Sequence, residues 1–167
     1  MDNINPIQNL IEKGQRSNST GSEYFASSAT NLLLHAFSMF EEISYERKEQ
    51  FVLPEAYIEF LQTVNNDTVA PLPGQELYIY GFYGTVIHTF DYFGCEGDLG
   101  YPVAFWLAVG HRSDRGNFFL CCDKASELYG QVGEFYDSCP FKGEGDFYEV
   151  GIDFADFCRN VMDGNVY

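Results

Sequence analysis

The chain has 167 residues, of which 46% are hydrophobic and 17% aromatic. This composition supplies enough apolar material for one buried core and excludes disorder over the whole length. With 25 acidic and 9 basic residues, the formal net charge is −16, so nucleic acid, whose phosphates have the same sign, is not expected as a partner. No apolar run approaches the roughly 20 residues of a membrane-spanning helix, and no secretory leader is expected, because a polar, amphipathic stretch follows Met1.

The five cysteines form an odd set without Cys-x-x-Cys spacing: Cys95, Cys121, Cys122, Cys139 and Cys158. Neither a disulfide framework nor a zinc-binding pattern follows from that arrangement. The reducing cytoplasm is therefore the expected setting.

The acidic residues are unevenly distributed. Between Lys48 and Arg112 the sequence contains no Lys or Arg, yet it holds eight acids: Glu49, Glu55, Glu59, Asp67, Glu76, Asp91, Glu96 and Asp98. A surface built from this stretch is predicted to be strongly negative. The acidity has two explanations at this point, namely solubility of an aromatic-rich protein and attraction of a basic partner.

The N-terminal 27 residues are predicted to form a short helix and a polar connector. Ile4, Ile7, Leu10 and Ile11 lie on one face of a helix within residues 1–13, and the following GQRSNSTGS is rich in Gly and Ser. Residues 28–167 are expected to form one domain. Apolar spacings of three and four predict its first helix over about 28–48.

Two further helices have clear boundaries in the sequence. Pro54 suits the first turn of a helix over 54–65, which Asn65 and Asn66 end, because Asn tolerates the left-handed conformation. Asp153 is a predicted N-cap for a helix over 153–163, with Gly164 as its stop.

Short strands linked by turns are predicted between the second and third of these helices. They cover 76–80, 85–90, 102–110, 117–123, 129–136 and 147–150, with a turn at 81–84 and HRSDRG joining the central pair. The predicted fold class is therefore α+β, a single domain with a mainly antiparallel β-sheet flanked by helices.

Four segments resemble the SUKH superfamily. LPEAYIEFLQTVNN, from Leu53 to Asn66, is similar to that family's first helix, and VGHRSDRGNFFLCCD is similar to its strand, turn and strand ending in an acid. YGQVGEFYDS and DFADFCRNV resemble the next strand and the closing helix. Asn66-Asp67 replaces the usual glycines, and residues 1–27 have no counterpart. The resemblance implies a SUKH-like α+β fold that binds proteins, as immunity to a toxin in most bacterial members and as regulation of cell-wall synthesis in fungal ones.

The residues that could carry catalysis or bind a metal have simpler explanations. His111, Arg112, Ser113, Asp114 and Arg115 are predicted to form a polar turn, since neighbours in a turn seldom converge on one point. His35 in a helix and His88 in a strand are interpreted as partly buried imidazoles, and no metal site is predicted. Asp91, Glu96 and Asp98 lack the alternating pattern of a calcium loop. In the Cys121-Cys122 pair, one thiol is expected in the core and one at the surface.

The segment from Phe90 to Tyr101, FDYFGCEGDLGY, is the candidate contact loop. It mixes aromatic rings with acids, a composition suited to a protein-binding hot spot that faces a basic partner. The candidate partner-binding residues are Asp91, Phe93, Glu96 and Asp98, with Asp67 and Glu76 nearby in sequence. The alternative is that the rings of this loop fold back onto the core.

The functional hypothesis is a non-catalytic immunity protein that neutralises a cognate toxin through an acidic surface. A basic nuclease is the natural complement, and a deaminase or peptidase toxin stays open. The alternative hypothesis is a regulatory scaffold that binds a cellular protein. No cofactor, catalytic residue, nucleic acid or membrane is expected in either case.

Overall fold

The computed structural model describes residues 5–17, 49–72, 74, 76–95, 105–113, 116–135 and 147–166. Within these ranges, one sheet of seven strands follows the order of the chain, and each neighbouring pair is antiparallel. The strands are β1 (Gln15–Ser17), β2 (Thr68–Ala70), β3 (Leu77–Ile79), β4 (Trp106–Arg112), β5 (Asn117–Cys121), β6 (Val132–Phe135) and β7 (Phe147–Gly151). The predicted α+β class with a mainly antiparallel sheet is confirmed.

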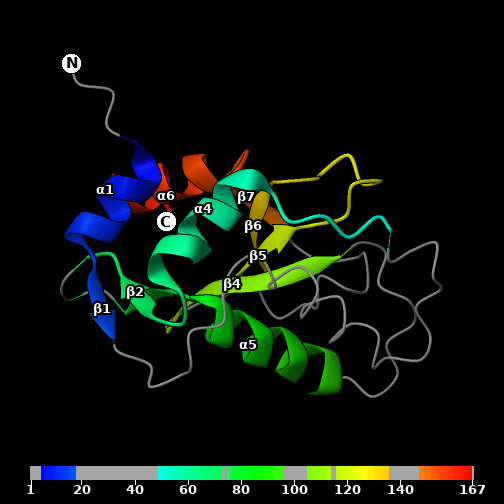
Figure 1. Ribbon diagram of the computed structural model, residues 1–167, viewed down its shortest axis with the longest axis horizontal. Helices are drawn as coiled ribbons and strands as arrows, with labels where there is room; N and C mark the ends of the chain where they lie inside the picture. Colours follow the sequence, from blue (N-terminus) through cyan, green and yellow to red (C-terminus); the bar gives the residue numbers. More distant parts are fainter. Residues whose placement is uncertain are drawn as a thin grey trace.

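The helices in the described part of the chain are α1 (Pro6–Lys13), α4 (Glu55–Val64), α5 (Phe82–Cys95) and α6 (Phe154–Met162). Figure 1 shows α1, α4 and α6 gathered on the side of the molecule away from α5, which runs beside β4. The first and last helices, α1 and α6, pack against each other. None of the helices in the described ranges is long and apolar enough to cross a membrane.

The core is formed where the apolar stripes of α1, α4 and α6 meet the sheet. Tyr57 and Phe60 of α4 lie with ring centroids 4.8 and 5.2 Å from that of Phe154 on α6. Leu10 of α1 is fully buried in the same cluster. Each such side chain contributes about 1.5–3 kcal/mol when it leaves water, so the three helices are fixed mainly by this shared burial.

The predicted ends of α4 and α6 are confirmed. The side chain of Asp153 caps α6 by accepting a hydrogen bond of 2.7 Å from the N–H of Asp156. Pro54 directly precedes the first residue of α4, and Asn65, in the left-handed region with φ 54°, ends it. Both helices therefore have the boundaries that their capping residues indicate.

The strand predicted over 85–90 and the turn over 81–84 are wrong, because α5 occupies both. The helix is held by two threonines one turn apart: Thr85 Oγ1 lies 2.7 Å from the hydroxyl of Tyr57, and Thr89 Oγ1 accepts a 3.0 Å hydrogen bond from the N–H of Ala108. Glycine at 81 allows the chain to enter α5 close to the end of α4, since a Cβ there would collide with the backbone carbonyl oxygens of residues 65 and 67. Tertiary contacts have overridden the strand propensity of the β-branched residues.

The N-terminal segment also differs from its prediction. The short helix is confirmed as α1, with Ile7, Leu10 and Ile11 buried. However, Gln15–Ser17 form the edge strand β1, paired with the unpredicted β2, in place of a flexible connector. The rest of the connector, the helix expected over 28–48 and the domain boundary at 27/28 lie outside the described residues.

The central strands agree with the sequence pattern. β4 and β5 pair as predicted, and β4 is buried along most of its length, as its apolar composition indicates. The pairing shifts between Ala108 and Gly110, where a bulge lets Val109 accept a hydrogen bond of 2.8 Å from the N–H of Tyr80. β6 and β7 complete the sheet near their predicted positions.

Candidate functional site

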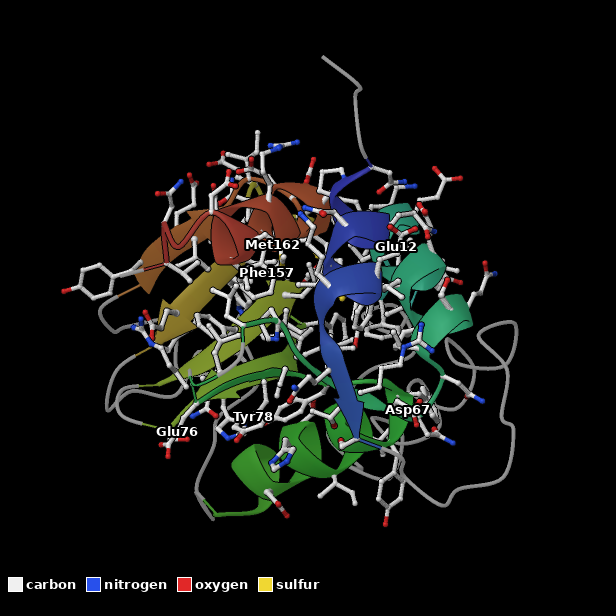
Figure 2. The ribbon with its side chains drawn as sticks, turned by 90° about the vertical axis from the view of Figure 1, so that its left-hand side faces the viewer. Glu12, Asp67, Glu76, Tyr78, Phe157 and Met162 are labelled. Atoms are coloured by element: carbon white, nitrogen blue, oxygen red, sulfur yellow. The ribbon has the colours of Figure 1, made fainter. Side chains whose placement is uncertain are left out.

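The predicted contact residues do not form one cluster among the described residues. Asp91 is exposed on α5, Glu76 is exposed before β3, and Asp67 is half-buried after α4. Figure 2 shows Asp67 well separated from Glu76. Phe93 lies in α5, although its side chain is outside the described set, as are Glu96 and Asp98. Because residues 90–95 are helical, the candidate segment is not a loop throughout, which corrects that prediction.

Two of these acids also stand at structural junctions. The N–H of Asp67 donates to the carbonyl of Val64 over 3.0 Å, within the turn between α4 and β2. The carbonyl of Glu76 accepts a 2.9 Å hydrogen bond from the N–H of Ser113. Both hydrogen bonds use the backbone and do not require an acidic side chain; the side chain of Asp67 is half-buried, whereas that of Glu76 is exposed.

The structure brings together two tyrosines and two histidines from β3, α5 and β4, which we call the Tyr–His cluster: Tyr78, Tyr80, His88 and His111. His88 lies on helix α5, which corrects its predicted position in a strand, and stacks on Tyr80 with ring centroids 4.3 Å apart. The hydroxyl of Tyr80 lies 2.6 Å from Nδ1 of His111, which stacks on Tyr78 at 5.0 Å. Sequence spacing gave no signal for this contact, because the three elements meet only in the fold.

Both imidazoles are biased toward their neutral forms. Partial burial lowers the pKa of His88, and Asp91, one turn along the helix, opposes that effect. Burial also lowers the pKa of His111, and the nearby His88 lowers it further. The Tyr–His cluster therefore brings little positive charge to this side of the protein at neutral pH.

The cluster offers no complete set of catalytic groups. His111 and Arg112 are strand residues of β4, so the predicted polar turn starts later, at Ser113; residues 114 and 115 are outside the described ranges. His111 contacts a buried tyrosine hydroxyl, and no carboxylate hydrogen-bonded to this imidazole is observed among the described residues. The same part of the chain contains no group of three or more His, Cys, Asp or Glu side chains placed to hold a metal ion.

Cys121, Cys122 and Cys158 are core residues. Cys121 and Cys122 are both fully buried, so the prediction of a surface thiol at one of these positions is wrong. Burial raises the pKa of both thiols, and that of Cys158 on α6 as well. Because the thiolate is the nucleophilic form, these three groups are poorly suited to nucleophilic chemistry.

A buried ion pair joins β4 to β6. Arg112 and Glu134 are paired over 2.7 Å with side chains only 7% and 4% exposed, and Arg112 also donates to the carbonyl of Val166 near the C-terminus. The sequence pattern places Arg112 in a turn and gives no sign of this pair. A buried charge pair of this kind fixes the register of the elements that it joins and has no access to a substrate.

A shallow hollow lies beside α4 and is lined, as far as the chain is described, by Glu55, Ala56, Ile58, Glu59 and Gln62. Asn5, before α1, donates a 3.1 Å hydrogen bond to Oε1 of Glu59. The hollow thus has acidic and amide groups but no histidine, hydroxyl or thiol among those described residues.

The outer side of α5 has a different character. Tyr83 is 58% exposed and Ile87 is 36% exposed, and Asp91 is exposed four residues further on. Spacing by four places these three side chains in one row, which we call the α5 row. The row could have been recognised from sequence only if 82–95 had been predicted as a helix.

The comparisons with known proteins identify one family. The model of the SMI1 / KNR4 family (SUKH-1) matches residues 41–160, well over half of the chain. No curated protein and no solved structure matches the chain. The matched segment begins after α1 and β1. It includes strands β2 to β7, helices α4 and α5, and most of α6.

Proposed function

This chain belongs to the SMI1 / KNR4 family (SUKH-1), and we propose that it is a non-catalytic immunity protein that neutralises a cognate toxin by binding it through an acidic surface. Family membership supports a protein-binding role. The observation that carries the immunity proposal is the charge distribution, eight acids without a single Lys or Arg from Glu49 to His111.

The position of these acids supports a role in binding. Glu49, Glu55, Glu76 and Asp91 are exposed, so their charges face solvent and do not neutralise buried partners. Charges of one sign at a surface attract an oppositely charged protein and increase the rate of encounter. A toxin that acts on nucleic acid needs a basic surface, whose positive charge would be attracted to these exposed acids.

The first test is protection in cells. We expect a toxin-like gene immediately upstream of the gene for this protein; its toxin domain is expressed in a bacterial host with and without the protein, and survival is counted. We expect the wild-type protein to restore growth. Killing that is unchanged by a well-expressed protein would overturn the proposed immunity role and favour the regulatory scaffold.

The second test addresses the absence of catalysis. Single replacement of His111, Asp114 or Cys122 by Ala should leave protection intact in each variant that retains the circular dichroism spectrum of the wild type. The expected reason is that protection depends on an interface and not on one reactive group. Complete loss of protection in a correctly folded variant of this set, with binding retained, would support an enzymatic mechanism instead.

A further inference from the structure

We propose that the α5 row, Tyr83, Ile87 and Asp91, is the docking surface for the toxin, with Tyr83 as the aromatic anchor and a basic toxin domain as the occupant. This inference rests on the proposed immunity function. It goes beyond that function by assigning the contact to one helix face and by giving each of the three side chains a role.

The two sides of α5 have different environments. The inner side is fixed by Thr85 and Thr89, which are both buried and hydrogen-bonded to Tyr57 and to the backbone of Ala108. The helix is thus anchored without using the α5 row. An exposed tyrosine and isoleucine one turn apart on a rigid helix lose little conformational entropy on binding, which favours an interface.

The charge of α5 favours a basic partner. The 14 residues of α5 contain no Lys or Arg, and the neighbouring imidazoles of the Tyr–His cluster have lowered pKa values, so nothing on this helix neutralises Asp91 at pH 7. In the sequence Glu96 and Asp98 follow the last residue of the helix. The apolar pair Tyr83 and Ile87, beside the acid Asp91, is complementary to an apolar pocket rimmed by Lys and Arg.

The acidic residues near the C-terminal end of α5 oppose the stability of the helix. The C-terminal end of a helix carries a partial negative charge, so acids near it weaken the helix, whereas Lys or Arg would stabilise it. Asp91 lies near that end, Glu96 follows it directly, and the last turn contains no basic residue. Residues that disfavour the local fold are often retained for function.

A second copy of this chain does not fit the same surface. Each copy has a net charge of −16, and pairing two α5 rows would bring Asp91 of one copy toward the acids of the other. Like charges that face each other across an interface repel, so the surface favours a basic partner over self-association.

The chain offers a matched control for the apolar pair. Tyr148, on the edge strand β7, is 53% exposed, and Ile152, four residues later, is 63% exposed. The double variants Tyr83→Ala/Ile87→Ala and Tyr148→Ala/Ile152→Ala therefore remove the same two exposed side-chain types from different parts of the fold, and the control pair includes the more exposed isoleucine.

The probe is the purified toxin domain encoded beside this gene, immobilised for surface plasmon resonance. We expect Tyr83→Ala/Ile87→Ala to dissociate about tenfold faster or more than the wild type, because loss of a hot-spot anchor acts on the dissociation rate. The Tyr148→Ala/Ile152→Ala variant should stay within about twofold of the wild type, as expected for residues outside the contact. Thermal unfolding of both variants verifies that each is folded.

The outcomes separate the two proposals. If Tyr83→Ala/Ile87→Ala binds the toxin domain as tightly as the wild type does, the α5 assignment is overturned and the immunity function stands. The same holds if the control variant is weakened equally. A wild-type protein that does not bind the toxin domain would overturn both. As an independent readout, Asp91→Asn should slow association without lowering the melting temperature, and a lower melting temperature with unchanged association would assign Asp91 a structural role instead.

Discussion

The hydroxyl of Tyr57 on α4 lies 2.7 Å from Oγ1 of Thr85 on α5, and both groups are inside the core. Burial raises the pKa of Tyr57 well above its ordinary value, so the phenol remains protonated and available for this hydrogen bond. The contact joins α4, the helix that the sequence predicts most clearly, to α5, part of which the sequence pattern predicts as a strand.

Thr85→Val should destabilise the protein by about 1–3 kcal/mol, because Val keeps the shape but leaves the buried Tyr57 hydroxyl without this partner. The double variant Tyr57→Phe/Thr85→Val removes both polar groups and should recover most of that loss. Urea unfolding measures each free energy. If the double variant loses as much stability as Thr85→Val and Tyr57→Phe lose together, the contact has no such role.

Arg112→Met should destabilise the fold by about 3–5 kcal/mol, because Glu134 would be left as a buried charge without its partner. The matched control is Arg159→Gln, which removes an exposed arginine paired with Asp156 on α6 and should cost under about 1 kcal/mol. Chemical denaturation of both variants gives the comparison. Equal effects in the two variants would contradict the buried position of Arg112.

Leu10→Ala should cost about 2–5 kcal/mol, because Leu10 is fully buried between α1 and the rest of the core. The expected result makes α1 part of the folding unit, although it lies before the segment that the family model matches. Glu12→Ala, on the exposed side of the same helix, is the control and should stay within about 0.5 kcal/mol. A melting temperature that is insensitive to Leu10→Ala would mean that α1 is an appendage.

The protein should lose stability as the pH falls below about 6.5, the ordinary pKa of histidine. His88 and His111 have lowered pKa values in the folded state, so the unfolded state takes up their protons first and is favoured. The loss grows with falling pH until both folded-state pKa values are passed.

The check on this prediction is the free energy of unfolding at pH 7.5 and 5.5 for the wild type and for His88→Gln. The variant should show a smaller decrease between the two pH values. NMR titration should place the midpoints of His88 and His111 below 6.5, and midpoints above that value would reverse the expected sign.

The sequence predicted those elements whose ends carry capping residues or whose composition is unambiguous. Asp153 and Asn65 define the limits of α6 and α4, and the apolar run that ends at Val109 indicates a buried strand. β1 could not be predicted, because its three exposed residues are polar and gain strand geometry only by pairing with β2. Edge strands of this length lack the alternating pattern on which prediction depends.

The candidate site was harder to predict, for a related reason. Thr85, Val86, Ile87 and Thr89 favour a strand by local propensity, and the two glycines at 81 and 84 are typical of a turn. What makes this segment a helix is its set of distant contacts, including that between Thr89 and Ala108. With the wrong secondary structure, the spacing by four of the α5 row could not be recognised.

The most direct test of the account is the association rate with the toxin domain measured at several salt concentrations. We compare the wild type, the triple variant Asp91→Asn/Glu96→Gln/Asp98→Asn, and the charge-matched control Glu127→Gln/Glu149→Gln/Asp163→Asn, whose three acids are exposed outside the acidic stretch. The wild-type rate should fall steeply as the Debye length shortens from about 10 Å at 0.1 M to about 3 Å at 1 M salt. The triple variant should already associate slowly at low salt, while the control stays near the wild type. Association that does not depend on salt and is unchanged in the triple variant would show that the acidity serves solubility alone.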